Sequence, residues 1–288
     1  MTPALRGTLL IVVAVGIFAC MDTIAKYLAR SYPVPGVIWA RFAANLLILL
    51  LFLAARGQLK LLRTARPGLQ ITRGLLLAGA TMLYFTSLTV LPLAEAAAIG
   101  FVMPLFLALL AVPMLGERMD GARLAAILVG LAGAIVIVRP GAAVFTPYAL
   151  LPVGMALCNA LYQILTRRVA GVEHPLTSLL WGAIVGAVLF SFALPFFWVT
   201  PTDPWHWVLF GIIGLLASIG HFTLIRAYDY ANATGLAPFF YTQLVWVILL
   251  GWLVFGDFPD GWSLLGTGII VASGIYLVGR QRLTMHRR

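Results

Sequence analysis

Ten apolar stretches, each close to the length that crosses a membrane, constrain this chain more than any other feature. A transmembrane helix needs about 20 residues to cross about 30 Å of hydrocarbon. The connections between the stretches are short and rich in proline, glycine and charge, so they leave no room for a soluble domain. The stretches run over residues 7–28, 34–55, 74–91, 93–115, 122–138, 148–166, 176–199, 205–228, 234–255 and 262–279. The sequence therefore predicts an all-α integral membrane protein with ten transmembrane helices.

Composition supports a membrane protein over a soluble one. The chain is 62% hydrophobic and 10% charged, whereas soluble domains are about 45–50% apolar and about 25% charged. The formal net charge of +10 could indicate a nucleic-acid partner, but most of the basic residues fall on one side of a ten-span topology. By the positive-inside rule this predicts cytoplasmic termini in a cell inner (plasma) membrane, with basic side chains near anionic lipid and no nucleic-acid partner.

One loop motif occurs twice in the sequence and indicates an internal duplication. GERMDG at residues 116–121 recurs as GDFPDG at residues 256–261, each time between two apolar stretches. A unit of five spans is odd, so the second copy must enter the membrane from the opposite face. We therefore expect two inverted five-helix repeats, residues 1–140 and 141–288, around a central cavity. The acidic residues of the motif are expected to cap the helices that follow, since carboxylates are stabilised by the positive N-terminal end of a helix. They are Glu117, Asp120, Asp257 and Asp260.

The repeated segments resemble a known family. LAEAAA at residues 93–98, followed by MPL at 103–105 and LGE at 115–117, is similar to the EamA-type module of the drug/metabolite transporter superfamily, and residues 231–278 look like its second copy. The resemblance implies a secondary transporter that exports small metabolites by alternating access. Within the superfamily, the bacterial amino-acid exporters are the most similar, which implies aromatic and other neutral amino acids as cargo with broad specificity.

Polar and aromatic side chains inside the spans are the candidates for a substrate path. Burying polar groups in a membrane is costly, so each needs a partner or an aqueous cavity. Helical spacing places several of them on common faces of the third, sixth, eighth and ninth spans. The candidates are Tyr84, Asn159, Tyr162, Gln163, His221, Phe239, Gln243 and Trp246. The alternative is that these faces bind helices to one another, because Asn, Gln and Thr side chains also form hydrogen bonds between helices.

Three charged residues form a second candidate group. Asp22 and Lys26 lie one helical turn apart and are expected to neutralise each other, and Arg41 is expected within reach of Asp22. A structural ion pair is favoured over a role in coupling to protons. His221 could carry a coupling proton or form a neutral pocket wall.

Several other functions lack support in the sequence. The P-loop, HExxH and GxSxG motifs are absent from the sequence. Cys20 and Cys158 lie in apolar spans, with no other Cys or His at the spacing of a metal site. We therefore expect no cofactor, no metal and no enzymatic activity. The alternatives left open are a carrier for another metabolite, such as a nucleoside-like or cationic drug-like compound, a membrane enzyme acting on lipids, and a channel. The expected partners are a small-molecule substrate and membrane lipids, with the chain a monomer or a homodimer.

Overall fold

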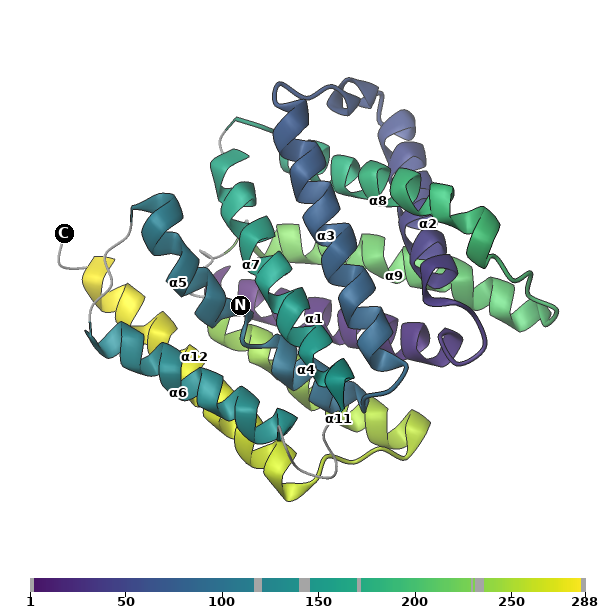
Figure 1. The fold of residues 1–288 in the computed structure, drawn as a ribbon. Helices are drawn as coiled ribbons and strands as arrows, with labels where there is room; N and C mark the ends of the chain where they lie inside the picture. The colour runs from purple at the N-terminus through teal and green to yellow at the C-terminus, as the bar shows by residue number, and fades with distance from the viewer. Residues whose placement is uncertain are drawn as a thin grey trace.

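The computed structural model describes residues 3–116, 121–139, 146–169, 172–228, 230 and 236–285, and within these ranges all regular structure is helical (Figure 1). The first half contains α1 (Pro3–Leu28), α2 (Val34–Ala55), η1 (Leu59–Leu62), α3 (Pro67–Leu88), α4 (Leu93–Gly100), α5 (Met103–Leu115) and α6 (Gly121–Val138). The second half contains η2 (Pro147–Ala149), α7 (Leu150–Val169), α8 (Pro175–Phe197), α9 (Pro204–Tyr228), η3 (Ala237–Tyr241), α11 (Thr242–Phe255) and α12 (Gly261–Met285).

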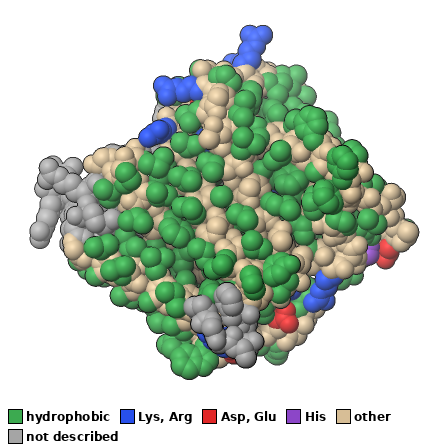
Figure 2. Space-filling model, in the orientation of Figure 1, with side chains coloured by type: hydrophobic (Ala, Val, Ile, Leu, Met, Phe, Trp, Pro, Cys, Tyr) green, Lys and Arg blue, Asp and Glu red, His purple; other side chains and the backbone are tan. Residues whose placement is uncertain are grey.

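The predicted membrane segments are confirmed. Seven helical segments are long and apolar enough to cross a membrane, and three shorter apolar helices, 124–138, 239–255 and 261–276, complete the ten. Hydrophobic side chains cover most of the face in Figure 2, and the charged side chains lie near its edges. The chain is therefore an all-helical membrane protein.

Contacts between equivalent helices show that the two halves are inverted. A two-fold axis in the membrane plane reverses each helix, so equivalent helices that touch must run antiparallel. In the α2–α8 pair, Trp39 Nε1 donates to Ser191 Oγ at 2.9 Å, while Phe42, further along α2, lies against Gly186, which comes earlier on α8. Contacts between different helices also come in matched pairs: α1 packs on α9 as α7 packs on α3, and α5 packs on α7 as α11 packs on α1.

The other equivalent pair, α6 and α12, packs backbone to backbone. The two helices lie side by side in Figure 1. A Cβ added at Gly133 would lie 2.9 Å from the carbonyl oxygen of Gly266, and one added at Gly266 would lie 2.6 Å from the carbonyl oxygen of Gly133. Small residues allow this close approach, because helices in lipid associate through van der Waals packing.

Each copy of the repeated loop motif ends one helix and leads into the next. Gly116 and Gly256, with φ of 70° and 75°, end α5 and α11 in the left-handed conformation that glycine adopts without strain. Asp260 caps α12, because its Oδ1 accepts a hydrogen bond from the backbone N–H of Ser263 at 2.8 Å, as predicted. Asp257 forms an ion pair with Lys26 and lies four residues before the start of α12, where Asp260 is the capping residue. Glu117 and Asp120 lie outside the described residues.

The Asp260 cap leads to a pH prediction. The backbone N–H of Ser263, and secondarily its side chain and Arg139, hold the pKa of Asp260 below its ordinary value of 3.8. A lowered folded-state pKa contributes stability that is present above the ordinary pKa and is lost as the pH falls through the folded-state value. Asp260→Ala should lower stability at pH 7 by about 1 kcal/mol, and Asp260→Asn by less, because asparagine also caps well. Melting temperatures in detergent at pH 7 and below pH 4 test this. Equal melting of all three proteins at pH 7 would contradict it.

Candidate functional site

A group of polar side chains lies inside the helix bundle, and we call it the central cluster: Asp22, Arg41, Thr81, Tyr84 and Gln243. The first four come from α1, α2 and α3 of the first half, and Gln243 comes from α11 of the second half. Asp22 Oδ2 accepts hydrogen bonds from the hydroxyl of Tyr84 and from Nε2 of Gln243, each at 3.5 Å. Arg41 Nη1 donates to Thr81 Oγ1 at 3.2 Å. The cluster therefore joins the two halves around one carboxylate and one guanidinium.

Both charges of the central cluster are buried but weakly bonded. Asp22 is 5% exposed and Arg41 is 6% exposed. The bonds to Asp22 are long compared with the ordinary 2.7–3.0 Å, and Nε of Arg41 donates to the sulfur of Met21, a weak acceptor, at 3.4 Å. The predicted association of Arg41 with Asp22 stays a prediction, although the two side chains interact electrostatically. The arrangement therefore keeps both a donor and an acceptor available to another molecule.

Lys26 does not pair with Asp22, contrary to the prediction. Its Nζ lies 3.5 Å from Asp257 Oδ2 and donates to the carbonyl oxygen of Leu91 at 2.5 Å. Lys26 is one turn nearer the end of α1 than Asp22, and this turn lies beside the C-terminal end of α11. A cation is stabilised at a helix C-terminus by the negative end of the helix dipole. We call this end of the bundle the Lys26 end.

The Lys26 end carries two more polar links. Arg139 Nη1 forms an ion pair with Asp260 Oδ2 at 2.8 Å, and the hydroxyl of Ser263 donates to Glu95 Oε1 at 2.7 Å. Both connect the start of α12 or the residue directly before it, in the second half, to residues of the first half. Together with the Lys26–Asp257 pair, they tie the two halves together at this end.

Arg73, a buried guanidinium on α3, is not among the residues predicted from the sequence. Arg73 is 2% exposed. Its Nε donates to Thr166 at 3.0 Å and its Nη1 to Gln70, and its guanidinium lies 4.9 Å from the ring centre of Tyr162. The spacing of Gln70 and Arg73, three residues apart on one helix, was the available signal. These contacts join α3 to α7 away from the Lys26 end.

The predicted substrate residues fall into two groups. Tyr84 and Gln243 are in the central cluster, and the hydroxyl of Tyr162 accepts a hydrogen bond from Nη2 of Arg73 at 3.3 Å. The ring of His221 lies 5.0 Å from that of Phe18.

The remaining predicted residues lie elsewhere. Asn159 donates to the sulfur of Met155 at 3.4 Å, Gln163 is exposed, and Phe239 packs on an apolar group that includes Ile11.

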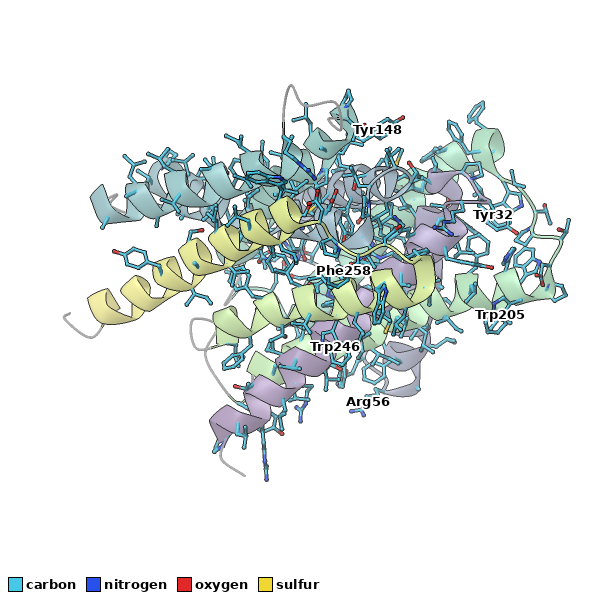
Figure 3. The ribbon with its side chains drawn as sticks, turned by 90° about the horizontal axis from the view of Figure 1, so that it is seen from below. Tyr32, Arg56, Tyr148, Trp205, Trp246 and Phe258 are labelled. Carbon is cyan, nitrogen blue, oxygen red and sulfur yellow. The ribbon has the colours of Figure 1, made fainter. Side chains whose placement is uncertain are left out.

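Trp246 lies on the outward face of α11, beside α1 in Figure 3. It is 38% exposed and shares this face with Val245, Leu249 and Leu253, which are also exposed. Its ring covers Gly16 of α1, where an added Cβ would lie 3.3 Å away. The expected common inner face of Phe239, Gln243 and Trp246 is therefore not formed, because the helix is rotated so that only Gln243 reaches Asp22.

Comparison with known proteins identifies the family. The chain matches the EamA-like transporter family twice, over residues 5–139 and 146–280. The chain belongs to the EamA-like transporter family. It is therefore a drug/metabolite transporter superfamily membrane protein that carries small metabolites, and not an enzyme. Among the described residues, no group of three or more His, Cys, Asp or Glu side chains is arranged to hold a metal ion.

Relatives of this EamA-like chain have several different cargoes in their names. It is 30% identical to an S-adenosylmethionine uptake transporter of Rickettsia conorii, over 93% of this chain and 90% of the relative. It is 29% identical to a riboflavin transporter of Vibrio cholerae, over 95% and 93%, and 28% identical to a pseudopaline exporter of Pseudomonas aeruginosa, over 94% and 95%. A solved crystal structure shares the fold, with a TM-score of 0.66, 21% identity and 98% coverage of both chains.

Proposed function

We propose that this transporter moves small zwitterionic metabolites, with neutral and aromatic α-amino acids as its cargo, by alternating access between its two inverted halves. The observation that carries the proposal is the buried, weakly bonded pair of Asp22 and Arg41. An α-amino acid presents one ammonium and one carboxylate, which match the carboxylate of Asp22 and the guanidinium of Arg41. A single charge of either sign would leave one of these buried groups without a partner, which is costly.

The surroundings of the pair favour an apolar or aromatic side chain on the cargo. Phe42 and Phe85 lie 4.9 and 5.9 Å from the guanidinium carbon of Arg41, measured to the ring centres. Tyr84 contributes a further ring beside Asp22. Aromatic walls supply apolar contact area and tolerate ligands of different shape. This supports broad specificity among neutral amino acids.

A second candidate cargo is an amino acid that carries a larger group. S-adenosylmethionine is itself an α-amino acid joined to a sulfonium and a nucleoside, and it is the substrate named for the Rickettsia relative. The same two charges would bind its amino-acid end. S-adenosylmethionine is both nucleoside-like and cationic, and compounds of these two kinds are the alternative cargoes that the sequence left open.

Orientation and direction are part of the proposal. Most of the basic residues outside the spans lie at the end opposite Lys26, so the positive-inside rule places the Lys26 end outside an inner (plasma) membrane and both termini in the cytoplasm. The named relatives include both uptake transporters and an exporter, and we propose export. The homologous repeats 1–140 and 141–288 would rock about the central cluster.

Counterflow in liposomes tests the cargo. Purified protein is reconstituted into liposomes loaded with unlabelled amino acid, and entry of labelled phenylalanine, leucine or S-adenosylmethionine is measured against protein-free liposomes. Saturable entry that rises with internal unlabelled amino acid is expected. If only S-adenosylmethionine exchanges, the second candidate replaces the first. Exchange of none of them contradicts the proposal, and entry without saturation or trans-stimulation indicates a channel.

A further inference from the structure

A cavity of about 230 Å³ lies at the Lys26 end, apart from the central cluster. Its wall comes mainly from α4, the end of α6 and η2. Two charged side chains complete it. Its lining is Leu91, Glu95, Ile99, Ile137, Val138, Arg139, Thr146 and Ala149. The cavity therefore combines one acid and one base with several apolar side chains.

Arg139 is placed to bind an anionic group in the cavity. Its Nη1 pairs with Asp260, but its Nε is buried and has no hydrogen-bond partner among the described residues. Its backbone has φ of 48°, a conformation that a non-glycine residue adopts at a cost. An unsatisfied buried donor also costs free energy, which a bound carboxylate would recover. The backbone strain and the unsatisfied donor therefore both belong to a residue that lines the cavity.

Glu95 supplies the opposite charge. Its Oε1 already accepts from the hydroxyl of Ser263, but a carboxylate has about four lone-pair sites and can accept further donors. An ammonium group in the cavity would find this acceptor. The cavity thus matches a small zwitterion with an apolar side chain.

The size of the cavity limits the ligand. At roughly 30 Å³ per water, 230 Å³ corresponds to about seven or eight waters. This is below the range of roughly 300–1,000 Å³ for sites that hold drug-sized molecules. A small amino acid such as leucine suits this space, whereas S-adenosylmethionine or riboflavin exceeds it.

The cavity also borders the contacts that tie the two halves together at this end. Leu91, which lines it, accepts the hydrogen bond from Lys26, and Lys26 pairs with Asp257. Asp260, the partner of Arg139, directly precedes α12. A ligand bound to Arg139 and Glu95 would therefore contact groups that must separate when this end opens.

We propose that this cavity is a second subsite for the small zwitterionic cargo, at the Lys26 end of the transport path. The proposal rests on the proposed function for the identity of the cargo, but the subsite is a separate place on the protein. Arg139 binds the carboxylate of the cargo there and Glu95 binds its ammonium.

Equilibrium binding of labelled L-leucine to the purified protein in detergent tests the subsite. The wild type should bind two molecules per chain. Ala149→Leu, which fills the cavity, and Arg139→Gln, which removes its cation without adding bulk, should each weaken one of the two sites at least tenfold. Arg41→Gln should remove the other. The matched controls are Ala125→Leu and Arg63→Gln, which change exposed residues and should leave both sites intact. Melting curves establish that each variant is folded.

The binding stoichiometry separates the two proposals. One site that is lost in Arg41→Gln but kept in Ala149→Leu and Arg139→Gln overturns the second subsite and leaves the proposed function standing. One site that is lost in Ala149→Leu and Arg139→Gln but kept in Arg41→Gln supports the subsite and overturns the central binding of amino acids. No leucine binding at either site overturns both.

Discussion

Arg41→Gln is expected to lower amino-acid exchange in liposomes roughly a hundredfold, because truncating one member of a buried charge pair costs on the order of 3 kcal/mol. The substitution removes the guanidinium that would bind the carboxylate of the cargo. It also leaves Asp22 buried without its opposite charge. The initial rate of counterflow at saturating internal amino acid is the measurement.

Three further variants separate loss of binding from loss of folding. Arg41→Lys keeps the charge but not the planar guanidinium, so partial activity is expected. The double variant Asp22→Asn with Arg41→Gln removes both charges, and should regain thermal stability relative to Arg41→Gln without regaining transport. Arg63→Gln removes an exposed arginine and should transport normally. If Arg41→Gln exchanges amino acids at the wild-type rate, the central cluster is not the substrate site.

Gly214→Ala should destabilise the whole bundle, although it adds a single methyl group. The added Cβ would lie 2.2 Å from Cβ of Ala44 and 3.0 Å from the backbone nitrogen of Asn45. These atoms belong to the body of α2 and have no flexible side chain that could move aside. Helix α9 must therefore separate from α2, and overpacking of this kind typically costs about 1–3 kcal/mol.

Gly211→Ala is the matched control for Gly214→Ala. Both glycines lie in α9, one turn apart, and a Cβ at Gly211 would meet nothing within 4 Å. Each substitution gains the same helix propensity, about 1 kcal/mol in favour of alanine. The difference between their melting temperatures in one detergent therefore measures packing alone. Gly211→Ala should melt at or above the wild-type temperature and Gly214→Ala below it, and equal melting would contradict the close packing of α2 on α9.

The architecture was largely predictable from the sequence, because it depends on the length of the apolar segments and on the odd number of spans in each repeat. Segments of about 20 apolar residues can satisfy their backbone hydrogen bonds in a membrane only as helices or closed barrels, and an odd repeat unit reverses the second copy. One detail was not predictable in this way: the segment 93–115 is divided into α4 and α5 at Phe101 and Val102. The break falls in an apolar run, and Pro104 just beyond it was the one signal in the sequence.

The site was less predictable, because a sequence pattern does not report how a helix is rotated about its own axis. Gln243 and Trp246 are three residues apart, yet Gln243 reaches Asp22 while Trp246 lies on the outward face of α11. Asp22 and Lys26 are one turn apart, yet Lys26 meets Asp257, far along the chain. In each case the packing of α1 against α11 selects the partner.

The sequence by itself determined that this protein crosses the membrane repeatedly as two inverted halves, since the length of the apolar segments and the repeated loop motif are local properties of the chain. The tertiary structure decided which charges meet. Gln243 approaches Asp22, and Lys26 approaches Asp257, because α1 packs against α11. Burial strengthens electrostatic interactions and penalises unpaired charges, so the partners of these charged side chains depend on how the helices pack, and not on the order of residues along one helix.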